Sequence, residues 1–221
     1  MPQLSPASAP LSRPAAFLSD IQGNLTALEA VLSDLAKRAV TDIFVAGNVV
    51  LGGAQPLETW MRLANIQARI TQGPKDLATA TVDPSTLNVT TEREKALLTQ
   101  FSDTRNKLGE FVLQKLKRLP LQVRVPLMSG DELVVVHGSP AEPGTEFSHD
   151  LDDDEMMALL GDDPADVVVC GGALVPFERM VAGVRIVNVG AVHNDKQRTA
   201  HYTIVTPRVD GTLVEQSWAD Y

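Results

Sequence analysis

Six short apolar runs in this sequence each stop at a polar turn that contains glycine, and this pattern limits the folds open to the chain. Stretches with apolar residues at helical spacing follow the first two runs, so strands and helices alternate in the first half. Such alternation indicates parallel β–α–β units, whose ligands gather at the carboxyl ends of the strands. The six turns are Ser19-Asp20-Ile21-Gln22-Gly23-Asn24, Gly47-Asn48-Val49-Val50, Gly73-Pro74-Lys75-Asp76, Val136-His137-Gly138-Ser139-Pro140, Gly171-Gly172-Ala173-Leu174 and Asn188-Val189-Gly190-Ala191-Val192. We expect a binding site to be assembled from these turns.

Apolar spacing also predicts the remaining elements. The expected helices cover about 25–35, 57–63, 91–119 and 155–160, and the expected strands cover 15–19, 43–46, 68–70, 121–125, 133–136, 167–169, 184–187, 201–205 and 212–214. The first half is therefore α/β and the second half mostly β. A single domain over residues 15–221, with two central sheets and helices outside them, accommodates both halves. Residues 1–14, which are rich in proline and serine, are expected to form a flexible leader.

Composition excludes several classes of protein. The 221 residues include 19 Lys+Arg and 28 Asp+Glu, which gives a formal net charge of −9. Because nucleic acids and anionic membrane surfaces attract basic proteins, we expect neither as a partner. Cys170 is the single cysteine and cannot form an internal disulfide, so we expect a reducing, cytoplasmic location. No apolar run approaches the roughly 20 residues of a transmembrane helix.

In order and spacing, the six turns resemble those of the calcineurin-like metallophosphoesterases, in particular the small bacterial and archaeal members. That family shows D-x-H-G-N, G-D-x-V, G-N-H-D, H-G-S-P, G-H-T-H and N-P-G-S, and the resemblance runs from about residue 15 to 205. It implies a sandwich of two mixed sheets flanked by helices, an α/β (α+β) fold, with two divalent ions that hydrolyse phosphate esters at the strand ends. The implied ligands are carboxylates, imidazoles and an amide, and a nearby histidine stabilises charge or protonates the leaving group.

Most of the ligand positions implied by this resemblance hold a different residue here. Asp20 and His137 keep the family's residue type. Gln22 replaces the histidine of D-x-H, Asn48 replaces the bridging aspartate, and Lys75 replaces the catalytic histidine. Three further positions offer no side-chain ligand: Pro74, Gly172 and Leu174. Because a neutral amide screens the repulsion between two dications poorly, we expect no two-metal site.

The resulting prediction is a non-catalytic family member that needs no cofactor and keeps a pocket for a small anion or a protein partner. The predicted vestigial pocket consists of Asp20, Gln22, Asn24, Asn48, Pro74, Lys75, Asp76, His137, Gly172 and Leu174. One alternative is a weakly active metal-dependent phosphoric ester hydrolase. Its single Mn, Fe, Zn or Mg ion would be held weakly by Asp20, Asn48 and His137. A second alternative is a structural subunit, for example of a homo-oligomer.

Lys75 is predicted to place a positive charge where the family keeps its ions. It could pair internally with Asp20 or Asp76, or it could anchor a small anion. We favour the internal pair, because the net charge of −9 disfavours anions and a buried Asp20 needs a partner. His193 could also approach the pocket. His149 belongs to a solvated acidic loop in this interpretation.

Overall fold

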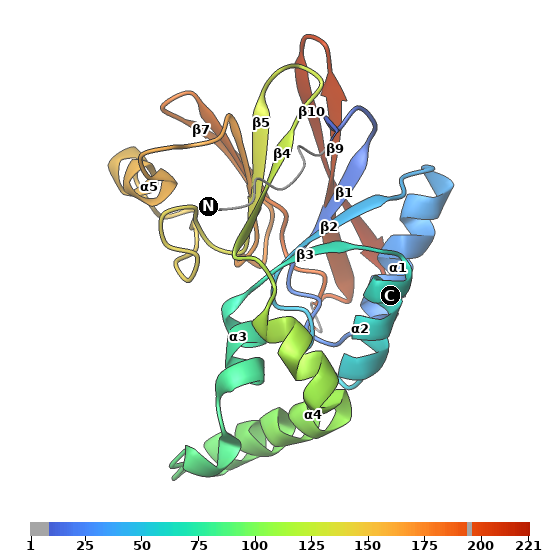
Figure 1. Cartoon of the computed structure of the whole chain (residues 1–221), viewed down its shortest axis with the longest axis vertical. Coiled ribbons are helices and arrows are strands. Elements are labelled where there is room, and N and C mark those ends of the chain that lie inside the picture. Colours follow the sequence, from blue (N-terminus) through green and yellow to red (C-terminus); the bar gives the residue numbers. More distant parts are fainter. Residues whose placement is uncertain (1–8, 194–195) are drawn as a thin grey trace, which may run out of the picture.

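Two five-stranded sheets face each other in the computed structural model, which describes residues 9–193 and 196–221 (Figure 1). The first sheet has the order β10-β9-β1-β2-β3. Its strands are β1 (Ala15–Leu18), β2 (Asp42–Ala46), β3 (Arg69–Thr71), β9 (Thr199–Arg208) and β10 (Gly211–Asp220). Strands β1, β2 and β3 run parallel, whereas β9 pairs antiparallel with both β1 and β10.

The second sheet has the order β4-β5-β6-β8-β7. Its strands are β4 (Gln122–Pro126), β5 (Glu132–Val136), β6 (Val167–Cys170), β7 (Phe177–Val181) and β8 (Val184–Asn188). The central strands β5, β6 and β8 run parallel, and the edge strands β4 and β7 are antiparallel to their neighbours. The carboxyl ends of three parallel strands in each sheet are thus available to build a site.

Helices lie on the outer faces of the two sheets and below them (Figure 1). They are α1 (Leu25–Lys37), α2 (Pro56–Asn65), α3 (Pro74–Thr81), α4 (Glu92–Lys117) and α5 (Asp153–Leu160), with a short 3₁₀ turn η1 (Pro84–Thr86). Helix α4 is broken at Gly109, whose φ of 69° is not helical. The helix packs into the core outside the first sheet through Leu108, just before this break, and through Val112, Leu113 and Leu116 after it. Its first half extends below the sandwich, beside α3 (Figure 1).

The alternation of side chains along β1 explains why the chain needs both sheets. Ala16 and Leu18 face the helices outside the first sheet, whereas Ala15 and Phe17 face the second sheet. Phe17 stacks on Phe44 of β2, with ring centroids 4.8 Å apart. Because burial of one such side chain contributes about 1.5–3 kcal/mol, the layer between the sheets is a main source of stability.

The predicted fold class is confirmed, and three details differ from the sequence analysis. Residues 74–81 form helix α3, so Lys75 lies in a first helical turn and not on a loop. Strand β7 was not predicted. Leu11 is buried and forms a parallel bridge with Leu127, so the chain packs against the domain four residues before the predicted boundary at 15. The first eight residues of the predicted leader lie outside the described residues. In the described part of the chain, no helix combines the length and apolarity needed to cross a membrane.

Candidate functional site

Loops from both sheets meet at the carboxyl ends of the parallel strands. Asp20 follows β1 and Asn48 follows β2 in the first sheet, while His137 follows β5 and Gly172 follows β6 in the second. Asp20, Asn48 and His137 are buried, with exposed fractions of 5%, 4% and 0%. The site is therefore an interior polar cluster between the sheets.

The Asn48 amide lies at the centre of this cluster. Its Oδ1 accepts a hydrogen bond from the backbone N–H of Lys75 at 3.0 Å. Its Nδ2 lies 2.9 Å from Asp20 Oδ1 and 2.9 Å from His137 Nε2. Because a backbone N–H can only donate, it fixes the amide orientation. The NH2 group of Asn48 therefore points at Asp20 and His137.

The partners of His137 determine its protonation. Its Nδ1 lies 2.6 Å from the carbonyl oxygen of Ala46, which can only accept, so Nδ1 carries a proton. Its Nε2 faces the Asn48 amide group, which donates, so Nε2 provides a lone pair. His137 is thus assigned as the neutral Nδ1–H tautomer, with both ring nitrogens engaged.

Asp20 is surrounded by neutral donors. Its carboxylate accepts hydrogen bonds from Ser19 Oγ at 2.9 Å, Gln22 Nε2 at 3.2 Å, Asn48 Nδ2 at 2.9 Å and the backbone N–H of Gly172 at 3.2 Å. Hydrogen bonds to an ionised acceptor are stronger than those between neutral groups. The four donors therefore provide the stabilisation that a cation gives elsewhere.

Asp76 joins the loops that follow β2 and β3. Its fully buried carboxylate accepts hydrogen bonds from the backbone N–H groups of Gly73 at 3.0 Å, Asn48 at 2.7 Å and Val49 at 2.8 Å. Burial raises the pKa of Asp76, and these hydrogen bonds oppose the rise. Asp76 thus has a structural role, which we call that of a strut: its hydrogen bonds fix the backbone of Asn48 relative to the start of α3.

The backbone around the cluster is tightly constrained. Asp20, Gln22 and Asn48 have φ values of 53°, 52° and 56°, in the left-handed region that costs a non-glycine residue about 1–2 kcal/mol. A Cβ atom at Gly73 would lie 2.4 Å from Asn48 Oδ1, and one at Gly171 would lie 1.9 Å from Ser19 Oγ. Glycine at these two turns permits the close approach of the loops.

The remaining predicted residues lie at the margin of the cluster. Pro74 is the exposed first residue of α3, and Leu174 is 51% exposed with no part in the network around Asp20. Asn24 caps helix α1 by accepting from the N–H of Ala27, and its Nδ2 lies 3.1 Å from His193 Nδ1.

Two further residues named in the sequence analysis take no part in the hydrogen bonds around Asp20. His149 packs against Phe177, with ring centroids 4.4 Å apart. Cys170 is fully buried, and burial raises the pKa of its thiol to about 12, so it is an inert apolar side chain.

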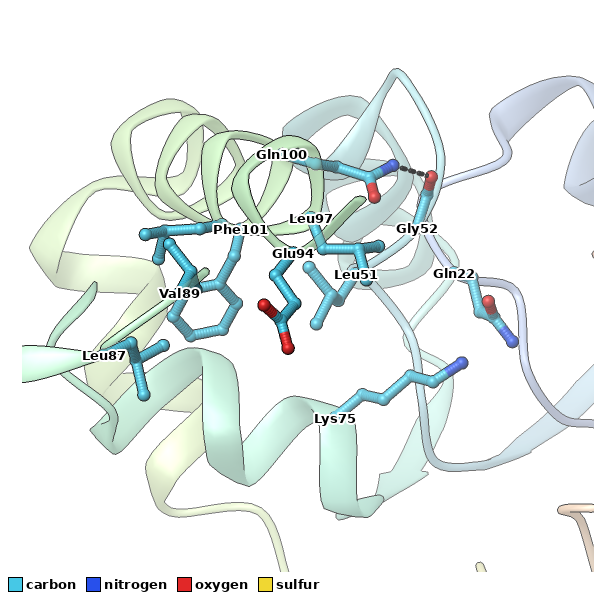
Figure 2. A pocket seen from close by; sticks show the side chains of 11 residues that line it. Gln22, Leu51, Gly52, Lys75, Leu87, Val89, Glu94, Leu97, Gln100 and Phe101 are labelled. Carbon is cyan, nitrogen blue, oxygen red and sulfur yellow. Dashed lines mark hydrogen bonds between the residues drawn. The ribbon is translucent and has the colours of Figure 1, made fainter. Parts of the chain in front are cut away.

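The predicted internal ion pair of Lys75 is not formed. Within residues 9–193 and 196–221, no carboxylate lies within 4.0 Å of its ammonium group, Asp20 and Asp76 included. Both carboxylates already have full sets of neutral donors, which removes the reason for the pair. The half-buried Lys75 side chain instead extends along a cavity toward Gln22 (Figure 2).

This cavity has a volume of about 470 Å³ and adjoins the polar cluster. It is lined by Gln22, Leu51, Gly52, Lys75, Leu87, Val89, Glu94, Leu97, Leu98, Gln100 and Phe101 (Figure 2). Only Gln22 and Lys75 belong to the pocket predicted from the sequence. The wall from α4 was missed because its apolar residues at helical spacing have the same pattern as core residues.

Three further residues in the site were also missed. Asn188 donates from Nδ2 to the carbonyl oxygen of Gly171 at 2.5 Å, and its position in the last of the six turns could have identified it. Ser19 adjoins Asp20 in the first turn. Glu146 packs on Gly172, where a Cβ atom would lie 2.4 Å from Glu146 Cγ. No sequence signal marks Glu146, because it comes from the loop between β5 and α5.

The donor set does not fit two divalent ions. In this site the Asn48 carbonyl oxygen and the His137 Nε2 lone pair are both used within the protein, and Gly172 and Leu174 provide no ligand. Among the described residues, no group of three His, Cys, Asp or Glu side chains is close enough to hold a metal ion. The arrangement is a closed hydrogen-bond network, and the ammonium group of Lys75 at its edge forms no ion pair with any described residue.

Two facing mixed sheets with polar loops at the ends of the parallel strands define a protein of the metallophosphoesterase type. The family model of the calcineurin-like phosphoesterase superfamily domain matches residues 15–210. The chain therefore belongs to the calcineurin-like phosphoesterase superfamily.

Solved structures share this fold at low sequence identity. A hypothetical protein from Pyrococcus horikoshii OT3 is 20% identical, with a TM-score of 0.77 over 94% of this chain and 88% of the other. A metallophosphoesterase from Sphaerobacter thermophilus is 24% identical, with a TM-score of 0.72 over 93% and 88%. A phosphoesterase from E. coli is 18% identical, with a TM-score of 0.52 over 92% and 98%. Among curated proteins, none matches the chain.

Proposed function

We propose that this protein is a non-catalytic member of its superfamily whose strand-end site binds a small anion without hydrolysing it. The observation that carries the proposal is the orientation of Asn48. Its NH2 group points at Asp20 and His137, the two positions that keep the ligand types implied by the family resemblance. A donor in this position repels a cation and satisfies the carboxylate and the imidazole in its absence.

The alternative of a single metal held by Asp20, Asn48 and His137 requires the Asn48 amide to turn over. Rotation would place its NH2 group against the N–H of Lys75, which would leave that donor without an acceptor. Each buried polar group left unsatisfied costs about 1–3 kcal/mol. Asp20 and His137 would also lose the donor that they share. The metal would have to offset all of these losses.

The anion-binding part of the proposal rests on Lys75. Lys75 is half-buried, and its ammonium group has no carboxylate within 4.0 Å in the described part of the chain. Lysine binds anions as a point charge. An anion at this position would balance the positive charge of Lys75, which no carboxylate of the described residues pairs with.

Hydrolysis of a chromogenic phosphodiester in the presence of manganese tests the absence of catalysis. We expect no turnover above that of buffer. A rate of about 1 s⁻¹ or more, abolished by Asp20→Ala and unaffected by Asp210→Ala at the exposed β9–β10 turn, would overturn the proposal in favour of the weakly active enzyme.

Thermal unfolding in the presence of small anions tests the binding. An anion that occupies the site raises the Tm by mass action, and Lys75→Met is expected to abolish the rise. If neither phosphate nor any carboxylate raises the Tm, the anion-binding part is wrong.

A further inference from the structure

The cavity beside Lys75 has far more apolar wall than a simple anion needs. Six apolar side chains line it: Leu51, Leu87, Val89, Leu97, Leu98 and Phe101. Leu87 and Leu97 remain 44% and 55% exposed, so part of this apolar surface is not covered by the protein itself. A ligand with an apolar body would cover it, and removal of that surface from water would favour binding.

The position of the cavity joins this wall to the polar cluster. The wall comes from the loop after β2, from Leu87 and Val89, and from the first half of α4 (Figure 2). Gln100 of α4 donates from Nε2 to the carbonyl oxygen of Gly52, and this bond ties the helix to the loop. Gln22 and Lys75 line the side where the cavity adjoins the polar cluster. A bound molecule can therefore extend from the ammonium group to the underside of α4.

The other charged group of the cavity is already engaged. Glu94 accepts through Oε2 from the backbone N–H groups of Thr90 at 2.9 Å and Thr91 at 2.8 Å. These hydrogen bonds lower the pKa of Glu94 to about 2. Among the ion pairs of the described residues, none joins the Glu94 carboxylate to Lys75. The cavity lining thus carries one ammonium and one carboxylate, which do not pair with each other, and the hydrogen bonds of Glu94 tie its charge to the start of α4.

These observations favour a single negative charge on the ligand. Asp20 lies beside the Lys75 end of the cavity through its contact with Gln22, and Glu94 lies in its wall. A dianion would face both carboxylates and an overall charge of −9 with only one ammonium to balance it. A monoanion matches that ammonium.

From these features, and resting on the proposed function, we infer that the cavity binds a monocarboxylate with an apolar body. The carboxylate lies at Lys75, and the body lies against Phe101 and the leucines. The volume of about 470 Å³ is within the usual range for small-molecule sites, about 300–1,000 Å³. It equals the volume of roughly fifteen waters at about 30 Å³ each, and this size suits a ligand with an alkyl chain of medium length.

Isothermal titration calorimetry with decanoate below its micellar concentration tests the inference. We expect decanoate to bind, and Lys75→Met to weaken it about tenfold, or about 1.4 kcal/mol, without changing the binding of the neutral matched probe 1-decanol. Phe101→Ala is expected to weaken both probes. Lys37→Met, at an exposed lysine at the end of α1, is the matched control and should change neither.

The outcomes separate this inference from the proposed function. Binding of phosphate that depends on Lys75, with no binding of decanoate, would overturn the ligand class and leave the proposed function intact. Equal binding of decanoate by the native protein and Lys75→Met would overturn the role of Lys75. If none of the probes binds, both the inference and the anion-binding proposal are wrong. A thermal scan of each variant without ligand identifies any that fails to fold, and Lys75→Ala then replaces Lys75→Met.

Discussion

Asn48 differs from an aspartate by one terminal group, and that group determines the chemistry of its neighbours. Either side chain could accept the N–H of Lys75 through one oxygen. Only the amide can also donate to Asp20 and His137. An aspartate would place a second carboxylate directly against Asp20 inside the protein. The buried cluster is therefore adjusted to a neutral residue at position 48.

We predict that Asn48→Asp destabilises the protein by about 2–4 kcal/mol at pH 7, because it removes a shared donor and buries an unpaired charge. Manganese should recover part of this loss, since a cation then has two carboxylates to bind. The free energy of unfolding from urea titration checks both effects. Asn88→Asp, at an exposed position, is the control and should change stability by less than about 0.5 kcal/mol. An unaltered stability of Asn48→Asp would show that the network is not as closed as described.

At the scale of the elements, Asp76 connects the loop after β2 to the start of α3. Replacement by alanine would leave three buried backbone N–H groups without an acceptor, those of Asn48, Val49 and Gly73. We predict that Asp76→Ala lowers the free energy of unfolding by about 3 kcal/mol or more. Asp83→Ala removes the exposed cap of η1 and should lower it by about 1 kcal/mol or less. Equal effects of the two substitutions would contradict the role of Asp76 as a strut.

A second link between elements joins α1 to β9. The hydroxyl of Tyr202 donates to the carboxylate of Asp34, and this hydrogen bond is the largest cause that lowers the pKa of Asp34 below its ordinary value of 3.8. A lowered folded-state pKa stabilises the protein above the unfolded pKa, and the contribution is lost as the pH falls through the folded value. The link therefore contributes at neutral pH and not in strong acid.

We predict that Tyr202→Phe destabilises the protein by about 1–2 kcal/mol at pH 7. The difference in free energy of unfolding between the native protein and the variant should narrow below about pH 3.8. Urea titrations at pH 7 and at pH 3 measure the two values. A difference of the same size at both pH values would assign the effect of Tyr202 to packing alone. Ser217 also bonds with Tyr202 and influences its pKa, so Ser217→Ala is a useful control for the hydroxyl's second contact.

At the scale of the whole molecule, the sequence predicted the sandwich because its signals are local. Each apolar run and its turn can be recognised alone, and their order matches a known family. Strand β7 was missed because Phe177–Val181, with the sequence FERMV, has neither a continuous apolar run nor a regular apolar–polar alternation. Helix α3 was missed because its first residues, Pro74 and Lys75, were assigned to the preceding turn.

The candidate site was less predictable than the fold because it depends on contacts between distant segments. The residues at strand ends were identified from their turns. The orientation of the Asn48 amide depends on the backbone N–H of a residue 27 positions away. The predicted ion pair between Lys75 and Asp76 was wrong because backbone donors already satisfy the Asp76 carboxylate. The apolar wall of the cavity comes from α4, whose first half has no motif that separates a ligand-facing residue from a core residue.

The most direct test of the central claim, that an amide network replaces the two-metal centre, is the metal content of the protein after incubation with manganese and removal of free ions. The network predicts no manganese above the level of a protein without a metal site, and the same Tm before and after treatment with a chelator. One or more manganese ions per chain, lost in Asp20→Ala, would contradict the claim. A chelator-induced fall in Tm of about 2–4 °C, which corresponds to roughly 1 kcal/mol for a domain of this size, would contradict it as well.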